Sequence, residues 1–225
     1  MQNQTAELEW RGDAVPVSTR FDDPYFSLED GLAETRHVFL AGNGLPSRFR
    51  DGFHIAELGF GTGLNFLTAL QCWQVAGSPG MFHFTSFEAF PMQVGDMARA
   101  HAAFPELESL SSHLCQRWRI EGGFFDVLPN ALLRVIVGDA RKELPLWDNV
   151  ADAWFLDGFS PAKNPELWSP ELLFEVGQHT VPGGTCATYT AAGFVRRSLS
   201  DAGFEVERVK GYGRKRHMTQ GIKSE

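Results

Sequence analysis

From residue 53 onward, short apolar runs alternate along the chain with segments whose apolar residues recur at helical spacing. Short, mostly apolar runs predict buried strands at 53–58, 81–88, 132–140, 151–159 and 184–190. Between and after these runs, apolar residues recur at helical spacing at 64–76, 92–104, 169–180 and 192–203. Two weaker segments, helical or extended, lie between 104 and 132. Strands alternating with helices predict an α/β fold with a doubly wound, Rossmann-like, mostly parallel sheet.

The C-terminal pattern modifies this sheet. Residues 204–222 predict two strands around a glycine-containing turn, with no room for a crossover helix. Such neighbours pair antiparallel. We therefore expect seven strands, of which one is reversed.

The first 50 residues predict an accessory segment packed on a core formed by residues 51–225, so that the chain is one domain overall. Residues 6–10 and 14–19 flank an Arg-Gly-Asp turn and predict a small hairpin. Residues 21–40 mix acids with aromatics and become helical from about Glu29.

Composition narrows the class of protein. The chain has 225 residues, 43% of them hydrophobic, which is enough for one sizeable core. The three cysteines, Cys72, Cys115 and Cys186, are scattered, and neither they nor the histidines show metal-ligand spacing, so we expect no metal site. The N-terminus lacks a signal-peptide pattern, and no apolar run approaches the roughly 20 residues that span a bilayer. We expect a cytoplasmic protein without membrane contact.

A glycine-rich turn follows the first core strand. Gly59, Gly61 and Gly63 are spaced G-x-G-x-G, which differs from the G-x-G-x-x-G of dinucleotide folds. Ligands bind at the carboxyl ends of such strands, where glycine permits close approach. A carboxylate at Glu57 suits a ligand with a cationic amino-acid end, such as S-adenosylmethionine. The alternative is a tight structural turn.

Three further residues extend this cofactor site. Glu88 ends the next strand, where a carboxylate accepts hydrogen bonds from ribose hydroxyls. Asp139 follows the third strong strand and is placed either to bind an adenine amino group or to cap a helix. Asn65, at the start of the helix after the glycine turn, is assigned to the same site.

A second motif ends the fourth strand at Asp157, followed by Phe159 in a loop rich in Lys, Asn and Pro. Methyl transfer needs a neutral acceptor lone pair aimed at the methyl carbon, and a carboxylate orients an amine and receives its proton. Phe159 would exclude water. The alternative is that Asp157 caps a structural element and the loop is ordinary.

Four stretches together resemble one family: "ELGFGTGLNFL", "DAWFLDGFSPAKNPELWS", "TYTAAGFVRRSLSDAGF" and "KGYGRKRHM". They are similar to the methyltransferase domain of the bifunctional tRNA 5-methylaminomethyl-2-thiouridine biosynthesis proteins (MnmC type), and residues 21–40 resemble that family too. The sheet expected above, with its reversed strand, is the topology of class I S-adenosylmethionine-dependent methyltransferases.

The resemblance implies conversion of 5-aminomethyl- to 5-methylaminomethyl-(2-thio)uridine at the wobble position of tRNA, with S-adenosylmethionine as methyl donor. It places Asp157 against the acceptor amine, Lys163 and Asn164 beside the flipped-out base or its phosphate, and Tyr25 and Phe26 over the pocket. The family's FAD-dependent oxidase domain does not follow residue 225, so we expect neither oxidase activity nor FAD in this chain, and a separate or fused oxidase partner.

A chain with a net negative charge can bind tRNA only if its positive charges are concentrated in one region. The chain carries −8, whereas residues 194–217 hold seven Lys and Arg against three acids, 7 − 3 = +4, which leaves −12 elsewhere. Arg214, Lys215 and Arg216 are thus predicted to contact phosphates near the anticodon, the alternative being a solvated basic turn. A flipped base would stack on Phe26, Phe159 or Trp168, each of which fits the core equally well.

Two other functions fit parts of the pattern. One is a methyltransferase or aminopropyltransferase acting on a small-molecule amine, which leaves the basic hairpin without a role. The other is a non-catalytic tRNA-binding module, against which the intact glycines and Asp157 argue.

Overall fold

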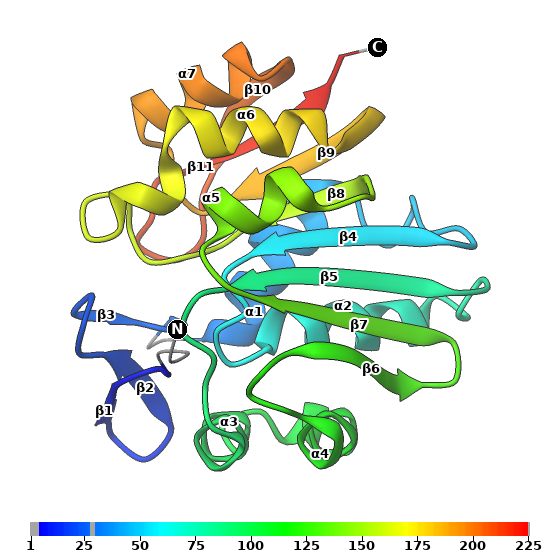
Figure 1. The fold of residues 1–225 in the computed structure, drawn as a ribbon, viewed down its shortest axis with the longest axis vertical. Coiled ribbons are helices and arrows are strands. Elements are labelled where there is room, and N and C mark those ends of the chain that lie inside the picture. Colours follow the sequence, from blue (N-terminus) through cyan, green and yellow to red (C-terminus); the bar gives the residue numbers. More distant parts are fainter. Residues whose placement is uncertain (1–4, 28–29, 225) are drawn as a thin grey trace.

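A computed structural model describes residues 5–27 and 30–224 of the chain. Its main sheet has eight strands in the order β10-β11-β9-β8-β4-β5-β7-β6 (Figure 1). The strands are β4 (Phe53–Leu58), β5 (Phe82–Glu88), β6 (Gly123–Leu128), β7 (Ala131–Val137), β8 (Ala151–Leu156), β9 (Thr180–Thr188), β10 (Phe204–Lys210) and β11 (His217–Lys223).

The fold class is confirmed, but the strand count differs. The five central strands, β9, β8, β4, β5 and β7, run parallel, and β11 is antiparallel to β9 as expected. A second reversed strand, β6, pairs antiparallel with β7 at the opposite edge. It comes from one of the two weak segments, where buried positions alternate only at Phe125 and Val127. The sheet therefore has eight strands with two reversed, rather than seven with one.

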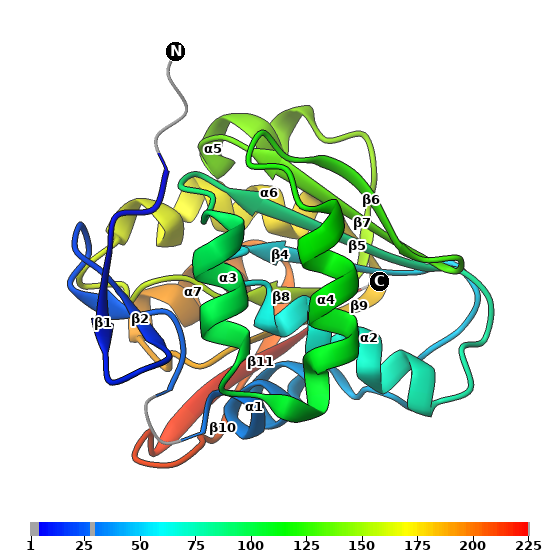
Figure 2. The same ribbon diagram turned by 90° about the horizontal axis from the view of Figure 1, so that it is seen from below.

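Helices cover both faces of the sheet. They are α1 (Gly31–Thr35), α2 (Leu64–Val75), α3 (Val94–His101), α4 (Glu108–Arg117), α5 (Ala140–Glu143), α6 (Pro170–Gln178) and α7 (Gly193–Asp201). One apolar core lies under α1 to α4 and another under α5 to α7. Figure 2 shows α3 and α4 side by side on the first face.

Strand β8 shows how one stretch supplies both cores. All six of its residues are buried. Because successive side chains of a strand point to opposite faces, Ala153 and Phe155 enter the first core and Trp154 and Leu156 the second. This two-sided burial explains why the stretch reads as a continuous apolar run.

The N-terminal residues form a separate three-stranded antiparallel sheet of β1 (Leu8–Arg11), β2 (Val15–Ser18) and β3 (Asp23–Pro24). The predicted hairpin is β1 and β2. Helix α1 begins at Gly31, where the Asp30 side chain accepts from the Ala33 amide; the expected helix start at Glu29 lies outside the described residues.

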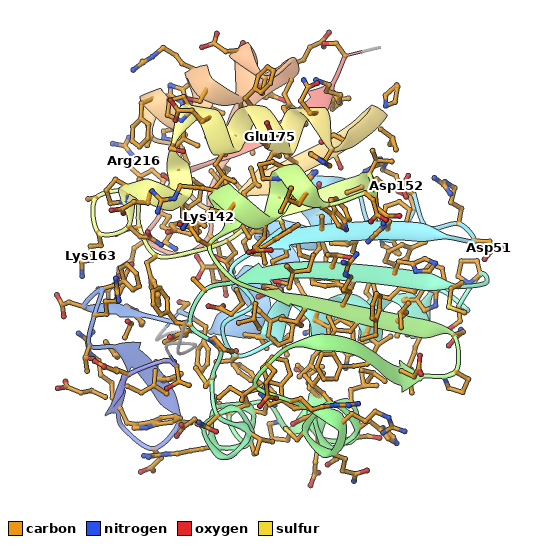
Figure 3. All side chains as sticks on the ribbon, viewed as in Figure 1. Asp51, Lys142, Asp152, Lys163, Glu175 and Arg216 are labelled. Carbon is orange, nitrogen blue, oxygen red and sulfur yellow. The ribbon has the colours of Figure 1, made fainter. Side chains whose placement is uncertain are left out.

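The small sheet lies at the end of the molecule where the central parallel strands terminate (Figure 1). In Figure 3, Lys163 and Arg216 lie at this same end and Asp51 at the opposite one. Among the residues that the structure describes, no helix has the length and apolar character needed to cross a bilayer.

Candidate active site

A cavity of about 750 Å³ opens at the carboxyl ends of the parallel strands. The strand-end residues Glu88, Asp139 and Asp157 line it, together with Gly59 and Gly61 of the glycine turn. Parallel strands bring residues distant in sequence to one sheet edge, which is where doubly wound folds bind ligands. The predicted site residues thus largely converge.

The glycine turn is built on backbone angles that side chains rarely adopt. Gly59, Gly61 and Gly63 have φ of 87°, 54° and 82°. A Cβ added at Gly59 would lie 2.5 Å from the Asp157 carbonyl oxygen, so this glycine lets β4 and β8 end close together. Gly63 is not among the residues that line the cavity. It precedes α2, where an added Cβ would meet Phe60 and Leu114, so it has a packing role, and its cofactor contact stays a prediction.

Glu88 is bound to the backbone by both carboxylate oxygens. It accepts from the Gly61 amide at 2.8 Å and from the Phe90 amide at 2.7 Å. Burial raises the pKa of Glu88, while these amides act in the opposite direction. One acid therefore fixes the glycine turn and also faces the cavity.

Asp139 caps a helix, which is one of its two predicted roles, and also faces the cavity. Its carboxylate caps α5 by accepting from the Arg141 amide at 3.0 Å, and it lines the cavity. The Arg141 side chain, with Nη2 at 2.7 Å from Oδ2, lowers the pKa of Asp139. Asp139 is thus held as a carboxylate beside the cavity by its own helix.

Asn65 joins two carboxyl groups, one buried and one half-buried. Its Nδ2 donates to Glu57 Oε1 at 2.9 Å and to Asp157 Oδ2 at 2.8 Å, and its Oδ1 accepts from Thr35 Oγ1 at 2.9 Å. The amide's two hydrogens are therefore both used on acids.

Glu57 lies behind this amide, not in the cavity. It is fully buried, accepts from Ser86 Oγ at 2.7 Å and is absent from the cavity lining. Burial raises its pKa well above the usual value, and the charges of Asp157 and Glu88 act in the same direction, against the hydrogen bonds from Ser86 and Asn65. Glu57 therefore faces Asn65 and Ser86 rather than the cavity, and its contact with a cationic ligand stays a prediction.

Asp157 is the acid best placed for proton transfer. It lines the cavity, and burial raises its pKa from 3.8 to about 7, with the Asn65 hydrogen bond acting in the opposite direction. A carboxyl with a pKa near neutrality exchanges a proton readily at physiological pH. Tyr189 closes this part of the site, its hydroxyl donating to the Gly158 carbonyl at 2.7 Å.

Residues 20–26, here called the strap, cross the cavity beside the loop after β8. Phe21 stacks on Phe159 with ring centroids 4.7 Å apart, and Tyr25 meets Phe159 edge-on at 5.0 Å. The Asp23 carboxylate accepts from the Ser160 amide at 2.9 Å. The strap thus closes one wall through aromatic and polar contacts.

Other predicted acceptor-site residues are distributed unevenly. Phe26 and Asn164 line the cavity. Lys163 lines it too, but its ammonium contacts the Asp22 carbonyl oxygen and lies 3.2 Å from the Asp22 carboxylate. Trp168 is buried and donates to the Phe159 carbonyl at 2.9 Å, so it belongs to the core and not to a stacking surface.

The basic turn between β10 and β11 divides in two directions. Arg214 and Arg216 are exposed, as a phosphate-binding surface requires. Lys215 instead lines the cavity, with its ammonium 2.8 Å from Glu34 Oε1 and 4.0 Å from the centre of the Tyr189 ring. The three side chains are therefore not one surface.

Glu34, Tyr189 and Asp23 line the cavity and were not predicted. Glu34 and Lys215 are 181 residues apart in sequence, and no local sequence pattern predicts that they form an ion pair. Tyr189 lies near the end of the predicted strand 184–190 and directly after β9, so the rule of strand-end residues would have found it.

Comparison with known proteins supports a methyltransferase. A family model described as S-adenosyl-L-methionine-dependent methyltransferase matches residues 105–224. A solved structure, MNMC2 from Aquifex aeolicus, superposes with a TM-score of 0.75 at 26% identity, covering 98% of this chain and 71% of that one. A methyltransferase from Pyrococcus furiosus, at 15% identity and a TM-score of 0.53, shares the fold.

Two curated relatives are bifunctional tRNA 5-methylaminomethyl-2-thiouridine biosynthesis proteins MnmC. The one from Stutzerimonas stutzeri is 44% identical over 97% of this chain, and that from Pseudomonas fluorescens 45% identical over 96%. The chain spans about a third of their length, 34% in each case. From the family model that matches more than half of it, the chain belongs to the S-adenosyl-L-methionine-dependent methyltransferase family.

Proposed function

We propose that this protein methylates the amine of 5-aminomethyl-(2-thio)uridine at the wobble position of tRNA. The observation that carries the proposal is the half-buried Asp157 carboxyl, with a pKa of about 7, on the cavity wall. The curated relatives, whose names describe synthesis of 5-methylaminomethyl-2-thiouridine in tRNA, align with nearly all of this chain. We further propose that it acts in the cytoplasm, with a fused or separate oxidase partner.

The cavity fits S-adenosylmethionine. A volume of about 750 Å³ lies within the usual range of small-molecule sites, on the order of 300–1,000 Å³. Its lining includes acids and amides, which match ribose hydroxyls, an amino-acid ammonium and an adenine amino group, alongside the cations Arg20, Arg141, Lys163 and Lys215. We assign Glu88 to the ribose, Asp139 to the adenine, and Gly59, Gly61 and Asn65 to the amino-acid end.

In the proposed mechanism the chain positions an amine and takes its proton. S-adenosylmethionine, when bound, supplies an electrophilic methyl group on a sulfonium. An alkyl amine arrives mostly as its ammonium form, so one N–H bond must break before nitrogen attacks. The Asp157 carboxylate accepts that proton and forms an O–H bond. Asn65 holds the receiving oxygen, and Phe159 with the strap limits water.

The tRNA would approach the end of the molecule that carries the strap and the C-terminal turn. Arg214 and Arg216 would contact backbone phosphates, and Lys163 and Asn164 would lie beside the extruded nucleotide. Phe26, Phe159 and Tyr25 would offer aromatic surface to its base, as single-stranded nucleotides usually require.

The decisive experiment incubates purified protein with labelled S-adenosylmethionine and tRNA that carries 5-aminomethyluridine, followed by nucleoside mass spectrometry. We expect 5-methylaminomethyluridine from the natural chain. The Asp157→Asn variant should lose 100-fold or more in rate, since general-base catalysis contributes about 10²–10⁴-fold. Cofactor affinity should remain within a few fold.

Two results would contradict the proposal. Methylation of free polyamines without tRNA would favour a small-molecule enzyme. tRNA binding without cofactor binding, measured by calorimetry, would favour a non-catalytic module.

A further inference from the structure

A second acid faces the region of Asp157. Glu34, on α1, lines the cavity, and its side chain is only 13% exposed. Its neighbour Thr35 donates to Asn65, which in turn donates to Asp157. The charge of Glu34 raises the pKa of Asp157 and that of Lys215 lowers it, so the three groups interact across the cavity.

The Lys215 ammonium occupies a site of defined chemistry. It lies between the Glu34 carboxylate, at 2.8 Å, and the face of Tyr189, at 4.0 Å from the ring centre. A carboxylate combined with an aromatic face is a typical binding site for an alkylammonium. The Tyr189 ring is fixed by its own hydrogen bond to Gly158.

Of the three groups Glu34, Tyr189 and Lys215, Lys215 is the one that can leave most easily. Its side chain is 46% exposed and comes from a turn, whereas Glu34 and Tyr189 lie on the cavity wall. A long flexible side chain leaves such a pair at low cost, because much of the ion pair is already solvated. Another primary ammonium of the same size would replace it with little change in charge.

We propose that Glu34 and Tyr189 form the binding site for the aminomethyl group of the acceptor in its ammonium form, and that Lys215 fills this site until the acceptor displaces it. The inference rests on the proposed function and names a specificity residue, Glu34, for it. The acceptor's ammonium replaces that of Lys215 beside Glu34, and one of its protons then passes to the Asp157 carboxylate. The acceptor's ammonium then occupies the position from which the charge of Lys215 lowers the pKa of Asp157.

The test compares two tRNAs that differ only at the wobble base, one with 5-aminomethyluridine and one with uridine. Their Kd values are measured in the presence of S-adenosylhomocysteine, which prevents turnover. The Kd of the uridine tRNA divided by the Kd of the aminomethyl tRNA reports the contribution of the amine, because contacts to phosphates are the same in both and cancel. We expect tighter binding of the aminomethyl tRNA to the natural protein.

Glu34→Gln should reduce this ratio about tenfold, because a hydrogen bond between charged groups contributes about 1.5 kcal/mol or more. Lys215→Met should leave the ratio unchanged or increase it, since the competing ammonium is gone. Glu106→Gln is the matched control: it removes another acid that pairs with a cation, Arg36, at 2.6 Å on the exposed surface. Its ratio should equal that of the natural protein.

An unchanged ratio in Glu34→Gln, with cofactor affinity preserved, would overturn the inference. A tenfold fall of the ratio in Lys215→Met would also overturn it. That result would mean that the Glu34–Lys215 ion pair, and not Glu34 alone, is needed to bind the amine. If Glu34→Gln does not fold, the ratio measured for Lys215→Met alone tests the inference. Failure of the natural protein to methylate aminomethyl tRNA would instead overturn the proposed function.

Discussion

At the scale of the residue, one amide binds two acids of the site, Glu57 and Asp157. Asn65 donates to Glu57 and Asp157 at once and is itself held by Thr35. Both carboxyls have raised pKa values, chiefly because burial disfavours their charged forms. The amide favours the ionised form of Asp157 enough to keep its pKa near 7 rather than higher.

This pKa sets the pH dependence of methyl transfer. Asp157 serves as a base only when ionised, so the single-turnover rate with saturating tRNA should rise as pH increases through about 7. Between pH 6 and pH 8 the ionised fraction of such a group rises roughly tenfold. Rapid-quench measurements on the natural protein test this, with Asp157→Asn as a control whose residual rate lacks the same rise. A flat profile in the natural protein would contradict it.

The sequence indicates site residues well where strand ends bring them together. Glu88, Asp139 and Asp157 each follow an apolar run, and the parallel sheet places all three on one cavity. It could not indicate that Glu57 turns into the protein behind Asn65, because the sequence does not show which hydrogen-bond partners a buried acid has. Nor could it pair Glu34 with Lys215, which depends on how the C-terminal hairpin lies against α1.

At the scale of the element, the strap connects the N-terminal sheet to the loop after β8. It is held there by the Asp23–Ser160 hydrogen bond and the stack of Phe21 on Phe159. The segment predicted to be accessory thus supplies part of the cavity wall. Periodicity indicates α2, α3, α6, α7 and the central strands but not α5 or β6. In β6, two buried positions are too few to distinguish a strand.

Asp23→Ala should weaken binding of S-adenosylmethionine about tenfold. The variant lacks a hydrogen bond to a carboxylate, worth about 1.5 kcal/mol, that keeps the strap against residue 160. Isothermal titration calorimetry measures the affinity. Asp13→Ala, at an exposed position in the turn between β1 and β2 of the same small sheet, removes an equal charge and should bind as the natural protein does. Equal affinities in both variants would show that the strap does not hold the cofactor.

At the scale of the whole molecule, charge is separated. The net charge of −8 includes a C-terminal segment of +4, so the remainder is −12. Arg214 and Arg216 are exposed at the end of the molecule where the cavity opens, and Arg216 is labelled there in Figure 3. An acidic body with one basic end favours a single orientation of a polyanion.

Replacing Arg214 and Arg216 together with Ala should weaken tRNA binding and flatten its dependence on salt. Because each arginine would neutralise one phosphate, the slope of log K against log salt concentration should decrease by up to about 2. Fluorescence anisotropy at several salt concentrations measures both quantities. Affinity for S-adenosylmethionine should not change, and a fall in both affinities together would indicate misfolding rather than a weaker hold on tRNA.

The additional strand β6 has a consequence for the protein in solution. The register between β6 and β7 shifts between Asp126 and Leu128. Such a bulge twists an edge strand, so that the edge of the sheet is no longer flat. The other rim, β10, carries Glu205, Glu207 and Arg208. Irregular or charged rims resist adding a strand from a second molecule. We therefore expect this protein to avoid edge-to-edge polymerisation even when concentrated.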